Sequence, residues 1–281
     1  IVPKNDEYFN EYINASNDRL KFISNFSGSA GFAIILRNKN YLFVDGRYTV
    51  QARYQAGKRF KIFTIPGKLP KDVIKTNKKI NIGFDPKLHT EKQLKFLFKI
   101  KNINLKSINK NLIDLVWINK PKESVKPFFS LSPKKTGAST LKKITQVKNI
   151  LLKNKFDYLL VTAPENVAWI LNIRGHDTSY SPIPNARLLI SKSGQIDLFT
   201  NLKKVNKIKK ILSNKINIQD EIKVENILKR LKRKKIWLDS FSCSFYYKNL
   251  LFKKNKVIEK IDPIHFLKSI KNNTEIKNME K

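Results

Sequence analysis

The chain has 281 residues, 57 Lys and Arg against 22 acids, and 41% hydrophobic residues. The length predicts two domains, and the apolar content excludes long disorder as the main state. No run of about 18 uncharged apolar residues occurs, so no membrane-spanning helix is expected. The single cysteine excludes a disulfide framework. The chain has no leader in which a basic stretch precedes an apolar one, and this favours a cytoplasmic protein. The start at Ile1 rather than Met suggests a piece of a longer chain.

The formal net charge of +35 comes mainly from lysine, with 48 Lys and only 9 Arg. Lys, Ile and Asn total 111 residues and are spread evenly. These residues have AT-rich codons, so composition drift explains the charge. Arginine, which suits bidentate phosphate and base contacts, is scarce. We therefore predict no specific nucleic-acid partner, and any such binding should be weak, independent of sequence and lost with salt.

A series of elements recurs along the chain at one constant offset of 154 residues, as from Phe32 to Ala186. The pattern predicts a hairpin, a short strand, a helix, a second strand and a further helix in each half. In the first half these lie at 32–36 with 41–45, at 82–85, around 96–98, near 103 and at 112–116; in the second, at 186–190 with 195–199, at 236–239, around 250–252, near 257 and at 266–270. We therefore expect two similar α/β domains in tandem, with mixed sheets flanked by helices.

The join between the domains is predicted at residues 126–139, which carry Pro and Gly and little periodicity. This places the first domain at residues 1–125 and the second at residues 140–270. Thr140 is expected to cap a helix, followed by a strand at 157–161. Residues 263–281 predict one helix without a cap or glycine stop. Its end, residues 271–281, is expected to lead into a further domain.

Histidine and cysteine offer few candidates for chemistry. His89, His176 and His265 lie in three separate segments without metal-ligand spacing. His89 and His265 are interpreted as helix-terminus residues. His176 lies in a loop beside Asp177, a position that suits acid–base work, but no nucleophile motif accompanies it. Cys243 has no nearby His, and a small buried cysteine is the simpler interpretation.

Two short segments of the first half are more distinctive. Residues 26–31, Phe-Ser-Gly-Ser-Ala-Gly, precede a strand, whereas a phosphate loop follows one and opens a helix. They indicate a tight turn packed against a neighbouring segment. Residues 45–48, Asp-Gly-Arg-Tyr, end a strand, and Asp45 is placed to cap the following helix. Arg47 falls in the first turn, where the dipole disfavours a cation, so it is a candidate for holding an anionic group. An ordinary salt bridge is the alternative.

Together these segments resemble Xaa-Pro aminopeptidases (aminopeptidase P). Residues 1–7, 26–31 and 44–48 resemble their first domain, residues 166–177 the matching signature of the second, and residues 271–279 the helix that enters the catalytic domain. The resemblance implies two creatinase-like domains of ribonuclease-H-like topology, followed by a pita-bread peptidase domain that is absent here. After Gly175 the chain departs from the family's pattern, which leaves fine contacts of that loop open.

The resemblance also implies function. The absent domain would hold two divalent metal ions, commonly manganese, on two Asp, one His and two Glu, and the intact enzyme would be a homodimer acting on peptides with proline at the second position. For this chain it implies no catalytic residue, no metal ligand, no peptidase activity of its own, and a place for Arg47 on the peptide cleft. A stand-alone creatinase-like binding module and the N-terminal part of a prolidase- or creatinase-type enzyme remain alternatives.

Overall fold

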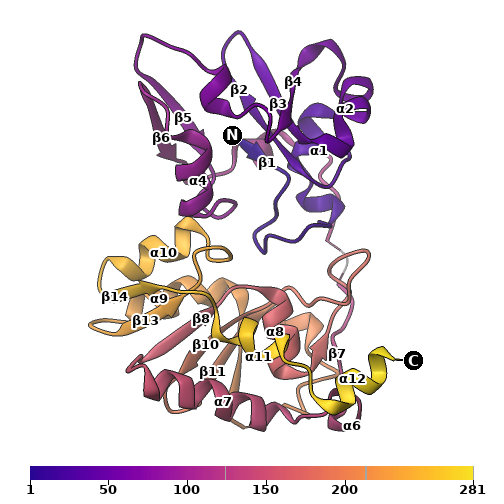
Figure 1. The fold of residues 1–281 in the computed structure, drawn as a ribbon, viewed down its shortest axis with the longest axis vertical. Helices are drawn as coiled ribbons and strands as arrows, with labels where there is room; N and C mark the ends of the chain where they lie inside the picture. Colours follow the sequence, from indigo (N-terminus) through magenta and orange to yellow (C-terminus); the bar gives the residue numbers. More distant parts are fainter. Residues whose placement is uncertain (124, 213, 281) are drawn as a thin grey trace. The chain divides into compact units, whose positions relative to one another are not determined.

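The computed structural model describes residues 1–123, 125–212 and 214–280 and divides the chain into two compact units, Ile1–Glu123 and Ser124–Lys281 (Figure 1). Both units combine strands and helices, as the repeated pattern predicts. Within the described ranges, no helix is long and apolar enough to cross a lipid bilayer.

The first unit has a four-stranded sheet in the order β1-β2-β3-β4 and a separate parallel pair, β5 and β6. The β1–β2 and β2–β3 pairs are antiparallel, and β3–β4 is parallel. The strands are β1 (Val2–Pro3), β2 (Gly31–Ile35), β3 (Asn40–Asp45), β4 (Lys61–Ile65), β5 (Ile80–Phe84) and β6 (Ile103–Ser107). The helices are α1 (Arg19–Ser24), α2 (Thr49–Ala56), α3 (Pro70–Val73), α4 (Glu91–Phe98) and α5 (Leu112–Val116), with 3₁₀ turns η1 (Ala15–Asn17), η2 (Gly46–Tyr48) and η3 (Gly57–Arg59).

Alternating side chains of β2 and β3 pack on the two faces of this sheet, because successive strand residues point to opposite sides. Ala33 belongs to a cluster that α1 and α2 cover. On the other face, Phe32 and Phe43 stack with ring centroids 4.9 Å apart. Phe98 of α4 meets Phe32 edge-on at 6.0 Å. The hairpin is therefore enclosed between helices on both sides.

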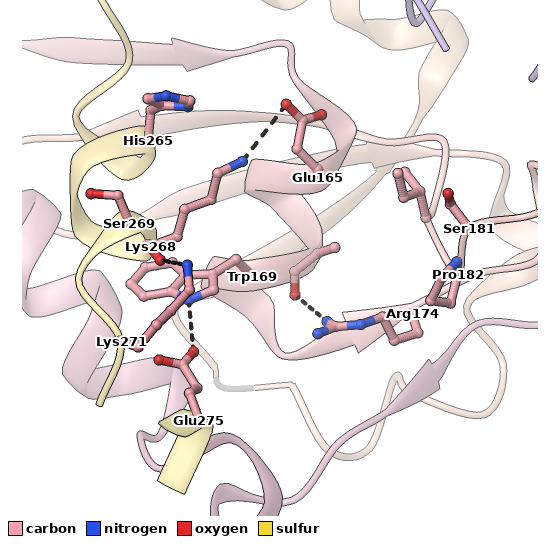
Figure 2. A pocket seen from close by; sticks show the side chains of 12 residues that line it. Glu165, Trp169, Arg174, Ser181, Pro182, His265, Lys268, Ser269, Lys271 and Glu275 are labelled. Carbon is pink, nitrogen blue, oxygen red and sulfur yellow. Dashed lines mark hydrogen bonds and ion pairs between the residues drawn. The ribbon is translucent and has the colours of Figure 1, made fainter. Parts of the chain in front are cut away.

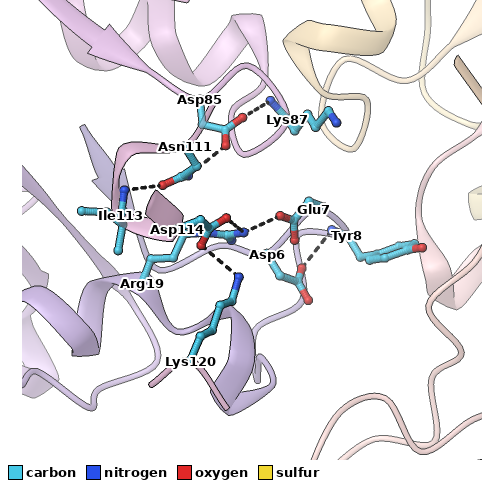
Figure 3. A network of polar contacts seen from close by, with 10 residues as sticks. All are labelled: Asp6, Glu7, Tyr8, Arg19, Asp85, Lys87, Asn111, Ile113, Asp114 and Lys120. Carbon is cyan, nitrogen blue, oxygen red and sulfur yellow. Dashed lines mark hydrogen bonds and ion pairs between the residues drawn. The ribbon is translucent and has the colours of Figure 1, made fainter. Parts of the chain in front are cut away.

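The opening segment is held to α1 and α5 by a network around Arg19 (Figure 3). The Arg19 side chain is 4% exposed, and its guanidinium donates to Glu7 at 2.7 Å and to both carboxylate oxygens of Asp114 at 2.9 and 2.8 Å. Lys120 binds the same Asp114 at 2.9 Å. Asp6, also buried, accepts the N–H of Tyr8 at 2.9 Å. Arg19 and Asp114 thus join segments 95 residues apart, whereas the contact of Asp6 is local, and a structural role explains the presence of these acids.

The second unit contains a six-stranded mixed sheet in the order β12-β11-β10-β8-β13-β14 and a short antiparallel pair, β7 and β9. The β8–β10–β11 pairs are antiparallel, whereas β11–β12, β8–β13 and β13–β14 are parallel. The strands are β7 (Phe129–Ser130), β8 (Tyr158–Val161), β9 (Ile173–Arg174), β10 (Arg187–Ser191), β11 (Ile196–Thr200), β12 (Ile216–Asp220), β13 (Lys235–Leu238) and β14 (Lys256–Glu259). The helices are α6 (Pro133–Thr136), α7 (Thr140–Lys153), α8 (Pro164–Leu171), α9 (Val224–Arg230), α10 (Phe245–Phe252), α11 (Pro263–Ser269) and α12 (Asn273–Met279), with 3₁₀ turns η4 (Leu202–Lys204) and η5 (Glu221–Lys223).

Two hydrophobic clusters lie on the two faces of this sheet, and adjacent strand residues divide between them. Leu159 of β8 packs with α7, α8 and α11, whereas its neighbour Leu160 packs with α9 and α10. Trp237 and Ile236 of β13 divide in the same way. Figure 1 shows α7 on one side of the sheet and α9 and α10 on the other. A helix–sheet–helix sandwich therefore explains why these strands are apolar on both faces.

The repeated order of elements is confirmed, with mixed sheets flanked by helices in both units. α4 and α10, for example, are related by the offset of 154 residues at both ends. The prediction of one helix over residues 263–281 is wrong. α11 ends at Ser269, and Asn272 caps α12 through a capping box in which the Glu275 side chain accepts the Asn272 N–H at 2.9 Å. The cap of α7 is Ser139, one residue before the predicted Thr140.

The predicted linker at residues 126–139 contains β7 and α6, and Phe128 within it is fully buried in the core of the second unit. Proline explains why the sequence pattern suggested a loop, because Pro133 opens α6 at a position where its missing N–H costs nothing. The domain limits of 1–125 and 140–270, and the role of residues 271–281 as a lead into a further domain, stay predictions.

Candidate functional site

The Phe-Ser-Gly-Ser-Ala-Gly and Asp-Gly-Arg-Tyr segments pack against each other. A Cβ on Gly28 would lie 2.3 Å from Cζ of Phe26 and 2.9 Å from Cγ of Tyr48, and one on Gly31 would lie 2.6 Å from the Phe43 carbonyl oxygen. The hydroxyls of Ser29 and Tyr48 are 2.9 Å apart. The predicted packing against a neighbouring segment is confirmed, and close packing is the reason for the glycines.

Arg47, the one substrate-binding residue predicted from the sequence, lies in η2 directly after β3. Asp45 is a cap, but of this 3₁₀ turn rather than of α2 as predicted, whose N-cap is Tyr48. Its Oδ1 accepts the Arg47 backbone N–H at 3.0 Å and the guanidinium Nε–H at 2.8 Å. Hydrogen bonding to Arg47 holds the pKa of Asp45 below its usual range. The Arg47 side chain is 66% exposed, and its guanidinium lies 5.4 Å from the Tyr48 ring centroid.

This geometry leaves Arg47 available to a ligand. An exposed ion pair adds little stability, because water screens both charges. A peptide carboxylate or carbonyl could therefore replace Asp45 at low cost. The peptide-binding role of Arg47 remains a prediction.

The histidine and cysteine candidates have ordinary structural positions. His89 is 1% exposed, lies edge-on to Phe84, and has its pKa lowered to about 3 by burial, so it stays neutral. His265 is exposed in the first turn of α11. Cys243 is buried, and desolvation raises the pKa of its thiol to about 12, so the interpretation as a small core residue is confirmed.

The His176–Asp177 pair is not a catalytic dyad. His176 is exposed and lies beside the Phe129 ring, with centroids 5.4 Å apart. Asp177 turns inward instead and forms an ion pair with Lys204 at 2.9 Å, with side chains only 1% and 2% exposed. Its other oxygen accepts the Asn185 N–H at 2.6 Å. Asp177 therefore anchors the loop rather than orienting the imidazole.

Among the described residues, no group of three or more His, Cys, Asp or Glu side chains could hold a metal ion. The described residues therefore offer no ligand set for the dinuclear centre that the resemblance implies.

A pocket of about 520 Å³ lies within the second unit, between α8, the loop at residues 181–183, α11 and α12 (Figure 2). Its lining includes Glu165, Trp169, Arg174, Pro182, Lys268 and Glu275. Trp169 and Arg174 belong to the segment 166–177 that carried the family resemblance, but neither was predicted as a site residue. The opposite wall is contributed about 100 residues later, so no local sequence signal could join the two.

Comparisons with known proteins agree with this architecture. Family models described as Creatinase/Prolidase N-terminal domain match residues 7–115 and 119–275. Xaa-Pro aminopeptidase 1 of Dictyostelium discoideum is 32% identical over 100% of this chain and 47% of its own length. A probable Xaa-Pro aminopeptidase P of Neurospora crassa is 30% identical over 100% of this chain and 44% of its own.

A solved structure shares the fold of the whole chain. The X-prolyl aminopeptidase of Caenorhabditis elegans, described as a cytosolic enzyme with a di-nuclear active site, superposes with a TM-score of 0.85 at 24% identity, covering 99% of this chain and 48% of that one. This chain thus spans about half the length of the curated relatives it matches. With two matching family models in tandem and a matching fold, the chain belongs to the Creatinase/Prolidase N-terminal domain family, as found in Xaa-Pro aminopeptidases.

Proposed function

We propose that this chain is the non-catalytic N-terminal portion of a Xaa-Pro aminopeptidase, a metallopeptidase that removes the residue preceding a proline at the second position. The observation that supports this most is the match of the entire chain to Xaa-Pro aminopeptidases about twice its length. On this proposal the two units shape access to a catalytic domain further along the protein and help to hold the peptide.

We assign Arg47 a contact with the substrate peptide. It lies at the end of a sheet strand, exposed, with a partner that a ligand can replace. The two metal ions, which we propose to be manganese, are assigned to side chains outside this sequence, because the described residues offer no cluster for them. We further propose a cytoplasmic, homodimeric enzyme.

The experiment compares the 281-residue chain with a protein extended by the reading frame beyond Lys281. Each is incubated with manganese and a tripeptide that has proline at its second position, and release of the N-terminal residue is measured. The extended protein should release it, and the 281-residue chain should not. A peptide with alanine in place of proline is the control for specificity.

Two results would contradict the proposal. Peptidase activity of the 281-residue chain would show that catalytic groups lie within it. A stop codon directly after Lys281 would favour the stand-alone binding module.

A further inference from the structure

We propose that the pocket of the second unit binds a carboxylate carried by an apolar peptide residue. Arg174 is the group that binds the carboxylate, and Trp169 belongs to the apolar wall of the pocket. The site lies entirely within the second unit. Arg47 belongs to the first unit, and the proposal does not depend on peptidase activity.

Arg174 provides the positive charge. Its Nη1 donates to the carbonyl oxygens of Ala168 at 3.0 Å and Ile173 at 2.9 Å, which orients the guanidinium at the pocket wall (Figure 2). Within the described residues no acid pairs with Arg174, and its Nε and Nη2 have no partner there. Partial burial lowers the pKa of this guanidinium. A bound carboxylate would offset that desolvation and accept the two remaining donors side by side.

The acids of the pocket are already engaged. Glu275 accepts hydrogen bonds from Trp169 Nε1 at 3.3 Å and from the Asn272 N–H at 2.9 Å. Glu165 lies 3.7 Å from Nζ of Lys268. Lys271 points its Nζ to the Lys268 carbonyl oxygen at 2.6 Å and pairs with no acid among the described residues. The charge that remains for a ligand is therefore positive.

The pocket also has an apolar wall, which begins beside Arg174 (Figure 2). Pro182 and Ile183 line it together with Trp169. The Trp169 indole is fixed at its nitrogen by Glu275, and the buried Nζ of Lys143 lies 4.2 Å from its ring centroid. The volume of about 520 Å³ is that of a small-ligand site. A lone inorganic anion would leave this wall without a contact, whereas an apolar residue bearing a carboxylate would contact both the wall and the Arg174 guanidinium.

The test measures binding of three probes to the 281-residue chain by calorimetry and by the shift of the Trp169 indole N–H resonance. N-acetyl-Ala-Leu carries an α-carboxylate, N-acetyl-Glu-Leu-amide carries only a side-chain carboxylate, and N-acetyl-Ala-Leu-amide carries none. At least one acidic probe should bind about tenfold or more tightly than the neutral amide, since one charged hydrogen-bonded pair supplies that difference. The tighter of the two acids identifies the source of the carboxylate.

Variants locate the effect. Arg174→Gln should reduce binding of the acidic probe to the level of the neutral amide, and Arg174→Lys should recover only part of it, because an ammonium lacks the planar fork. Arg230→Gln, a matched change at an exposed arginine ending α9, should leave binding unchanged. If Arg174→Gln does not fold, the comparison of the three probes on the unaltered chain and on Arg174→Lys still tests whether Arg174 binds the carboxylate. Equal binding of acid and amide, no shift at Trp169, or equal losses from Arg174 and Arg230 variants would overturn the proposal.

Discussion

Removing one partner of the buried ion pair between Lys204 and Asp177 should strongly destabilise the second unit. Lys204→Met keeps the length of the side chain but leaves the Asp177 carboxylate, only 1% exposed, without its cation. Removing one partner of a buried pair costs about 3–5 kcal/mol, mostly because the other charge stays buried and uncompensated. We therefore expect Lys204→Met to lower the free energy of unfolding of this unit by that amount.

A second ion pair provides a matched control. Lys192 and Asp157 have the same separation of 2.9 Å, but their side chains are 57% and 26% exposed. Because water screens such a pair, Lys192→Met should cost less than about 1 kcal/mol. The two variants thus differ in burial rather than in the distance between the charges.

Urea unfolding followed by tryptophan fluorescence measures both variants. Of the three tryptophans, Trp169 and Trp237 lie in the second unit and Trp117 in the first, so a Trp117→Phe background reports on the second unit alone. The double variant Asp177→Asn with Lys204→Met should recover much of the loss, because it removes the uncompensated charge. If Lys204→Met costs no more than Lys192→Met, the argument from burial is refuted.

Three further outcomes are expected. In the active enzyme, Arg47→Ala should lower kcat/KM about tenfold or more with an unchanged Tm, and Arg47→Lys should not restore it fully; a lower Tm with unchanged kcat/KM would indicate only a structural salt bridge. Cys243, with its thiol pKa raised to about 12 by burial, should resist a thiol reagent in the folded chain and react rapidly in urea, and fast labelling of the folded protein would disprove its burial. Burial raises the pKa of Asp262 to about 6, so the folded state favours the protonated carboxyl, and this stabilisation is lost as pH rises from about 4 through about 6. Asp262→Asn should flatten that part of the plot of unfolding free energy against pH. A variant with the same pH dependence as the unaltered chain would count against the raised pKa.

Some features of this protein follow from local sequence and were predictable without the fold. Runs of apolar residues between polar turns gave the hairpins, and one constant offset revealed the repeat because equivalent elements have equal lengths in both halves. Asp45 was predicted as a cap because its partner is two residues away. Such signals operate within one turn or one hairpin, so the sequence alone carries them.

Where the signal was local but ambiguous, prediction failed in a specific way. Residues 263–281 have helical periodicity throughout, yet the helix is interrupted between α11 and α12. At this interruption the Asn272 side chain packs against Gly137, in the space that a Cβ on residue 137 would occupy. Its amide also donates a hydrogen bond to the Thr136 carbonyl oxygen at 2.9 Å. That contact spans 136 residues, and no helical pattern contains it.

The partners of the charged and polar side chains were decided only by the tertiary structure. Asp177 stands next to His176 in sequence but pairs with Lys204, and Arg174 comes to the same pocket as Lys268 from nearly 100 residues away. Arg19 likewise finds Asp114 across the first unit. A charge can pair with any opposite charge that the fold brings near, so its neighbour in sequence says little. Periodicity determines which elements form; the packing of those elements determines which side chains meet.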